Sequence, residues 1–263
     1  MESNNISKTI FFVIFLAFFI SIFSCKKDSS TTTTTAATPN GTLILHLHTN
    51  VDTTEVDNYD SVYTLSSGRK ISVHLAQMFI SHVQAVKLDG SVVDFSGFSF
   101  LKVMENEAYV IGNIPVGNYK SVNFSVGLDA ATNAASPTTG SIFNTPAMWF
   151  NSTYSSSDGY VFVNFQGKID TTTNANGSVA NMQPFTYKIG TNAHLTNINM
   201  PEQDYTVAAN TPQYVHIIID YSKLLTGVQL NQSANLSVAN VAANSSTVAN
   251  KISNNIANLF HYE

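Results

Sequence analysis

Short segments in which apolar and polar residues alternate, each ending at a turn signal, recur through most of this chain. In Thr42–His48, Leu43, Leu45 and Leu47 would share one face of a strand, and Ile44, His46 and His48 the other. Similar segments cover residues 62–65, 69–88, 98–103, 108–114, 122–126, 160–165, 185–190, 194–199 and 214–220. Only the tail from Ser246 places apolar residues at helical spacing. The pattern predicts an all-β fold, an antiparallel β-sandwich of the immunoglobulin-like or Greek-key type with a short C-terminal helix.

The N-terminal segment has the pattern of a lipoprotein signal peptide. Its uncharged apolar run from Ile10 to Phe23 would span roughly 20 Å as a helix, which is too short for a hydrocarbon core of about 30 Å. A serine and Cys25, the only cysteine, follow the run, as in a bacterial lipobox. We expect residues 1–24 to be a signal peptide and Cys25 to carry a lipid that anchors the protein in the cell envelope, at the periplasmic or the outer face of the outer membrane. The alternative is an ordinary signal peptide with a chance cysteine.

Composition limits the remaining possibilities. Residues 25–40 are rich in Ser and Thr and predict a disordered tether, so the folded domain would be residues 41–263. Charged residues make up 11 % of the chain and the net charge is −5, which argues against a nucleic-acid partner. The chain contains no Gly-x-Ser-x-Gly, phosphate-loop or His-Glu-x-x-His motif. We therefore expect no enzymatic activity.

Histidines supply the candidate metal ligands. His46 and His48 would lie about 6.6 Å apart along one face of a strand, so both imidazoles can reach a single ion. Imidazole suits zinc and copper. The alternative is a half-exposed strand face without a metal. His74 and His82 lie in a second predicted strand, where each is either a ligand or a hydrogen-bonded strand or turn histidine.

Pro146–Gly167 carries the most specific motif. Met148-Trp149, then Asp158-Gly159 and the alternating strand Tyr160–Phe165, resemble the core signature of the MbnP-like copper-binding domain. Other segments resemble that family in the same order: Gly41–His48, Ser72–Ser81, Ile114–Tyr119, Val126–Asp129, Tyr187–Gly190, Val215–Asp220 and Asn255–Phe260. Together they cover nearly all of the predicted domain.

The resemblance implies an exported β-sandwich that binds one copper ion through histidines and a tryptophan oxidised to kynurenine. A dihaem peroxidase-like enzyme makes this modification. Carried over, His48 with its neighbour His46 would bind the metal, Met148 would add a soft thioether suited to Cu(I), and Trp149 would become the kynurenine. His194 or His82 would supply a third histidine.

One departure from the family pattern keeps a second hypothesis open. Family members often show His-x-Gly where this chain has Lys188-Ile-Gly190, and a metal near a lysine would have to displace its proton. Residues 155–158 also look like an insertion. The alternative function is a metal-free cell-surface module that binds glycan or protein through its polar loops.

Overall fold

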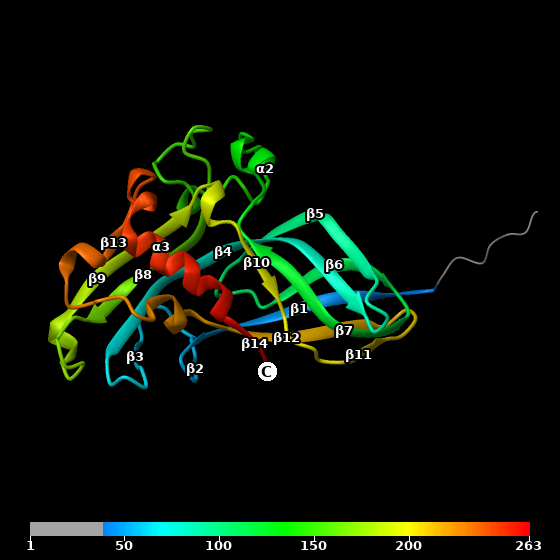
Figure 1. Ribbon diagram of the computed structural model, residues 1–263, viewed down its shortest axis with the longest axis horizontal. Helices are drawn as coiled ribbons and strands as arrows, with labels where there is room; N and C mark the ends of the chain where they lie inside the picture. The colour runs from blue at the N-terminus through cyan, green and yellow to red at the C-terminus, as the bar shows by residue number, and fades with distance from the viewer. Residues whose placement is uncertain (1–38) are drawn as a thin grey trace, which may run out of the picture. The chain divides into compact units, whose positions relative to one another are not determined.

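The computed structural model describes residues 39–263. The predicted signal peptide, Cys25 and nearly all of the predicted tether lie outside the described residues. Within residues 39–263, two β-sheets account for most of the ordered structure (Figure 1). No helix in this part of the chain has the length and apolar character needed to cross a membrane.

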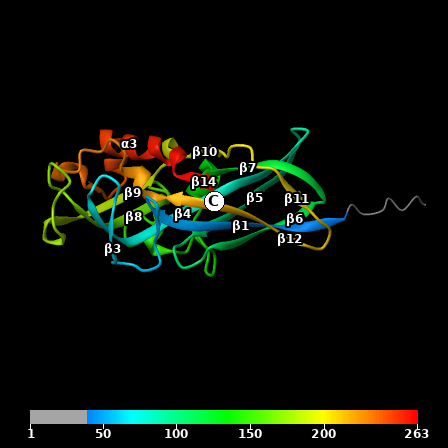
Figure 2. The ribbon, with the colours of Figure 1, turned by 90° about the horizontal axis from the view of Figure 1, so that it is seen from below.

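The smaller sheet has five strands within the described residues, and we call it the small sheet. Its strands are β1 (Asn40–Val51), β2 (Thr54–Glu55), β6 (Ala108–Pro115), β12 (Pro212–Asp220) and β14 (Phe260–Tyr262). β12 lies between β14 and β1, while β2 and β6 both pair with β1. β1 and β12 are parallel, and they lie side by side in Figures 1 and 2.

The larger sheet has nine strands within residues 39–263, and we call it the large sheet. Its strands are β3 (Val62–Thr64), β4 (Lys70–Lys87), β5 (Val92–Lys102), β7 (Gly117–Val126), β8 (Val161–Asp170), β9 (Met182–Gly190), β10 (Thr196–Asn199), β11 (Tyr205–Val207) and β13 (Ser237–Val238). β4 is central, because β3, β5, β7 and β8 all pair with it. Most pairs are antiparallel, with β13–β9 as the parallel exception in this sheet.

The main hydrophobic core lies between the two sheets. Leu43, Leu45 and Leu47 of β1 are fully buried and belong to one cluster with Met78 and Ile80 of β4. On β12, the alternating residues Val215, Ile217 and Ile219 join the same cluster. The predicted all-β sandwich is therefore confirmed. The parallel pairing of β1 with β12 is a feature that the sequence pattern did not predict.

β4 covers nearly all of the predicted strand segment 69–88 and bends within it. The bend is a β-bulge at His82, where the pairing with β5 shifts between Ser81 and Val83. His82 has a φ of 52°, a conformation that non-glycine residues adopt mainly in turns and bulges. β4 thus continues through the bulge as a single strand.

A second apolar cluster covers the outer face of the large sheet. Phe79 alternates on β4 with Met78 and Ile80, so its side chain points away from the main core. It packs with Phe162 and Met148 under the connection between β7 and β8. That connection contains α2 (Ala130–Ala134) and the 3-10 helix Pro146–Met148.

The predicted C-terminal helix is present as α3 (Thr247–Asn255). Ser246 caps it, because its side chain accepts a hydrogen bond from the backbone N–H of Ala249. Ala249 and Ile252 pack into the main core. A 3-10 turn follows α3 and leads into β14, which pairs with β12. The short helix therefore delivers the last residues to the edge of the small sheet.

β4 and β8 approach each other closely at Gly167. It pairs with Val73, and a Cβ at this position would overlap the backbone oxygen of Ser72. We expect Gly167→Ala to lower the free energy of unfolding by about 2 kcal/mol, since overpacking against backbone costs typically 1–3 kcal/mol. Gly97→Ala is the matched control, because no atom lies within 4 Å of its added Cβ. Urea unfolding should show a change within about 0.5 kcal/mol for the control; equal effects in both variants would contradict the explanation.

Candidate metal centre

His46 and His48 lie on the outer face of the small sheet. β1 alternates, so burial of its leucines in the core turns both imidazoles to the opposite face. The side chains are partly buried, with 23 % of His46 and 17 % of His48 exposed. His46 Nδ1 and His48 Nε2 are 2.9 Å apart. The sequence prediction that these two imidazoles share one strand face and can reach a single ion agrees with this geometry.

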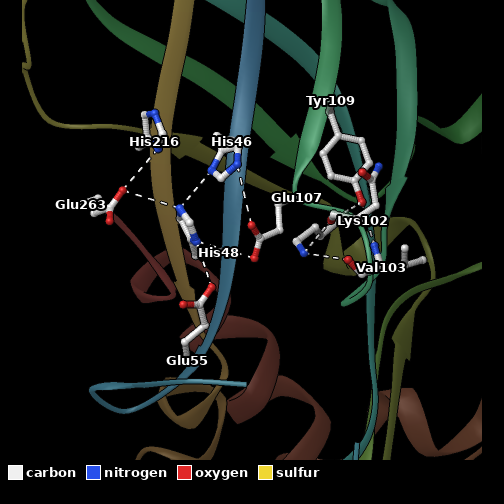
Figure 3. A network of polar contacts seen from close by, with 10 residues as sticks. His46, His48, Glu55, Lys102, Val103, Glu107, Tyr109, His216 and Glu263 are labelled. Atoms are coloured by element: carbon white, nitrogen blue, oxygen red, sulfur yellow. Dashed lines mark hydrogen bonds and ion pairs between the residues drawn. The ribbon is translucent and has the colours of Figure 1, made fainter. Parts of the chain in front are cut away.

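A third histidine, His216, joins them from the neighbouring strand. The parallel register of β1 and β12 pairs His46 directly with His216, and their ring centroids are 4.7 Å apart. One nitrogen from each of the three rings lies within 4.8 Å of the other two (Figure 3). We call His46, His48 and His216 the histidine cluster. Each can offer a lone pair to one ion.

Three glutamates surround the histidine cluster. Glu55 Oε1 lies 3.0 Å from His48 Nδ1, and Glu107 lies 3.6 Å from the same nitrogen and 3.7 Å from His46 Nε2. Glu263 Oε2 lies 3.3 Å from His216 Nδ1 and 3.5 Å from His48 Nε2. The carboxylates therefore contact both sides of the imidazoles. This arrangement matches metal sites in which a carboxylate holds the ring N–H of a ligating histidine.

The electrostatics of the cluster favour the neutral form of His46. Burial lowers the pKa of His46, and its neighbours His48 and His216 lower it further. The hydrogen bond with His48 lowers the pKa of Glu55, so that carboxylate stays ionised. A neutral histidine next to an ionised carboxylate is the protonation state that binds a metal ion. The residues present therefore fit a metal that takes imidazole and carboxylate ligands.

Met148 and Trp149 lie on the opposite side of the sandwich. Met148 is fully buried in the apolar cluster on the outer face of the large sheet. Trp149 packs against that cluster, and its Nε1 donates a hydrogen bond to the carbonyl of Phe143. The two sheets and the main core separate this corner from the histidine cluster. The structure therefore does not bring Met148 to His46 and His48, and Met148 has no place among their shared ligands.

Lys188 contacts the backbone next to Met148, at Trp149 and Phe150. Its Nζ donates hydrogen bonds to the carbonyls of Trp149, at 2.9 Å, and Phe150, at 3.4 Å. Burial lowers the pKa of this lysine, yet its hydrogens already point at carbonyl oxygens, so it offers no lone pair to a metal there. Within the described residues, the groups that meet at this corner do not fit a copper ion. The oxidation of Trp149 to kynurenine stays a prediction.

The other histidines named from the sequence lie outside the histidine cluster. His194 is buried, and its Nε2 donates to the carbonyl of Asn244. His82 sits at the bulge of β4 with its Nδ1 2.8 Å from Ser81 Oγ. His74 is exposed and contacts Asp60 at 3.3 Å. The third histidine expected from the sequence was His194 or His82, whereas the structure places His216 in that position.

The sequence carried a partial signal for His216. Alternation in the segment 214–220 buries Val215, Ile217 and Ile219, which already turns His216 outward, as on β1. The sequence did not show which strand would pair with the segment 214–220. Glu55, Glu107 and Glu263 come from three separate places in the chain and have no spacing that marks them as a set.

Comparison with known proteins agrees with this fold. No curated protein matches the chain. Among solved structures, it is similar to MbnP from Methylosinus trichosporium, with a TM-score of 0.51 and 13 % identity, over 81 % of this chain and 87 % of that chain. At this identity the likeness shows a common fold. The family described as MbnP matches residues 40–248, which confirms the resemblance seen in the sequence. The chain therefore belongs to the MbnP family.

Proposed function

We propose that this protein is an exported lipoprotein that binds a copper ion through His46, His48 and His216. The observation that carries the proposal is the convergence of three imidazole nitrogens within 4.8 Å on one face of the small sheet. Membership of the MbnP family supports copper as the metal. Imidazole is a preferred ligand of copper, and the copper ion stands highest in affinity among divalent first-row metals.

The proposal places the site on a membrane-anchored domain. The lipobox-like sequence at Cys25 supports a lipid anchor, and the Ser/Thr-rich segment that follows would hold the domain away from the membrane. A surface site with partly exposed imidazoles suits capture of copper in the cell envelope and its later release. The protein would then act in acquisition or handling of copper rather than in catalysis.

A copper titration of the full chain tests the proposal, with His216→Ala as the decisive variant. We expect the wild type to bind one equivalent in isothermal titration calorimetry. Loss of an outer-shell partner already costs roughly 10–100-fold in metal affinity, so loss of a direct ligand in His216→Ala should cost at least about 100-fold. His82→Ala is the matched control, because His82 is a partly buried strand histidine outside the cluster.

Two outcomes would refute the assignment. Absence of copper binding by the wild type would remove the proposed function. Equal affinity of the wild type and His216→Ala, together with a loss in His82→Ala, would move the site away from the histidine cluster.

A further inference from the structure

A second group of donor atoms converges on one ring nitrogen of His48. Glu55 Oε1 lies 3.0 Å and Glu107 Oε1 lies 3.6 Å from His48 Nδ1. One donor atom from each of these three residues lies within 4.8 Å of the other two (Figure 3). We call His48, Glu55 and Glu107 the carboxylate site. This group uses Nδ1 of the ring, whereas the contact of 2.9 Å with His46 uses Nε2.

Backbone pairing holds the three residues of the carboxylate site in place. His48 lies on β1, and Glu55 lies on β2, which pairs with β1 so that Glu55 is opposite Asn50. Glu107 directly precedes β6, and its carbonyl accepts a hydrogen bond of 2.8 Å from the N–H of Leu47. Contacts between β1 and the chain on either side of it therefore bring both carboxylates to one imidazole.

Asn50 provides an independent observation at the same place. It is 8 % exposed, and its Oδ1 is buried without a hydrogen-bond partner among the residues that the structure describes. Asn50 comes two residues after His48 on β1, so it shares the strand face of that imidazole, and it lies directly opposite Glu55. A buried carbonyl oxygen without a partner is costly, because it has lost its hydrogen bonds to water. A cation at the carboxylate site would give this oxygen a partner, either directly or through a bound water.

The two carboxylates have no cationic side chain to offset their charge. Among the ion pairs of residues 39–263, Glu55 and Glu107 pair only with histidines. The ammonium of Lys102 donates to the carbonyls of Val103 and Asn106 instead. Two carboxylates held this close repel each other, and a divalent cation between them offsets both charges.

The spacing and the chemistry of the donors suit one hard ion. Two atoms bound to one ion at about 2.1 Å are about 3.0 Å apart at a right angle and about 3.6 Å apart at 120°. The distances from His48 Nδ1 to the two carboxylate oxygens are 3.0 and 3.6 Å. Carboxylate and carbonyl oxygens suit Mg²⁺, Ca²⁺ and Mn²⁺, whereas imidazoles suit zinc and copper. The carboxylate site therefore favours a harder ion than the histidine cluster does.

From these observations we propose that the carboxylate site binds a divalent cation that prefers oxygen ligands, such as Mn²⁺, and that this cation competes with the histidine cluster for His48. A neutral imidazole has one nitrogen that accepts and one that carries a proton. An ion on Nδ1 leaves the proton on Nε2, which removes His48 from the histidine cluster. When Nε2 binds a metal instead, Nδ1–H donates to Glu55. The competition rests on the proposed function, whereas the carboxylate site does not.

The first test titrates the metal-free full chain with Mn²⁺ and follows free Mn²⁺ by electron paramagnetic resonance. We expect the wild type to bind one equivalent. Glu55→Gln and Glu107→Gln should each lose at least about 10-fold in Mn²⁺ affinity, since even an outer-shell partner is worth roughly 10–100-fold. His216→Ala breaks the histidine cluster but keeps the carboxylate site, so its Mn²⁺ affinity should stay within about 3-fold of wild type. Glu202→Gln is the matched control, since Glu202 is exposed and contacts Lys120 at 2.8 Å.

The second test repeats the copper titration in the presence of Mn²⁺. At a free Mn²⁺ concentration of about 100 times its Kd, only about 1 % of the wild type keeps a free carboxylate site, so copper affinity should fall at least about 10-fold. The fall should be smaller in Glu107→Gln, by about the factor that this variant loses in Mn²⁺ affinity.

Each adverse outcome has a distinct meaning. Absence of Mn²⁺ binding by the wild type, or equal affinity in the wild type and both glutamate variants, would overturn the carboxylate site and leave Glu55 and Glu107 as hydrogen-bond partners of His48. Loss of Mn²⁺ affinity in His216→Ala would place Mn²⁺ in the histidine cluster instead. Copper affinity that Mn²⁺ does not change would overturn the competition. Absence of copper binding by a wild type that binds Mn²⁺ would remove the proposed function and the competition but leave the carboxylate site.

Discussion

Simultaneous replacement of His46 and His48 by alanine is expected to abolish copper binding and the stability that copper adds. A ligand that binds only the folded state, at a free concentration of 1,000 times its Kd, stabilises a protein by about 4 kcal/mol. The wild type should show this gain in urea unfolding with saturating Cu(II). The double variant should show none, because a single imidazole, that of His216, remains from the cluster. Both histidines lie on the outer face of the small sheet, so the metal-free fold should persist, as far-ultraviolet circular dichroism would verify.

Two further variants establish where the copper binds. His74→Ala removes an exposed strand histidine that also contacts a carboxylate, and it should retain the full gain. Met148→Leu conserves volume in the buried cluster on the large sheet, so it should fold normally and bind copper as the wild type does. Loss of the copper-dependent gain in Met148→Leu, with retention in the double histidine variant, would place the copper at the Met148–Trp149 corner instead.

Local alternation explains how much of this site the sequence could predict. The leucines of β1 are fully buried, and burial of alternate residues forces His46 and His48 to one outer face. The same logic turns His216 outward on β12. The faces that the side chains of β1 and β12 occupy were therefore predictable from the residues of each of these two strands.

Long-range pairing explains what remained hidden. His46 and His216 meet because β1 and β12 pair in parallel, and these strands lie at opposite ends of the domain sequence. Parallel neighbours need a long crossover, so no short turn in the sequence marks their register. Glu263 depends on one more step, since the turn after α3 brings β14 against β12. Such contacts follow from packing of the whole core rather than from local residue order.

The Met148–Trp149 motif identifies a family but does not show where its residues lie relative to the histidines. The motif identified the family correctly, yet it could not show that the corner and the histidines lie on opposite faces. Lys188 was visible as a departure from the family pattern, and the structure gives it a definite role as a donor to the carbonyl of Trp149. The motif thus identified the family and its fold, whereas the position of the candidate metal centre could be seen only in the three-dimensional structure.

Lys102 should make the free energy of unfolding rise with pH. Its side chain is fully buried beside the site, and burial lowers its pKa to about 8, against about 10.4 for a lysine in an unfolded chain (Figure 3). Between these values the unfolded state binds more protons than the folded state, so stability increases as pH rises. At 1.36 kcal/mol per pH unit, the gain between pH 7 and 9.5 is about 2 kcal/mol of a total of about 3 kcal/mol.

Lys102→Met isolates this contribution, because methionine keeps an unbranched apolar side chain but cannot titrate. We expect the rise between pH 7 and 9.5 to disappear in urea unfolding of metal-free Lys102→Met and to persist in Lys168→Met, whose side chain is exposed. The range must end below pH 10, since burial raises the pKa of Tyr109 to about 12. Above pH 10 the unfolded tyrosine loses its proton first, which lowers stability and opposes the effect of Lys102. A rise of the same size in both lysine variants would show that another group causes it.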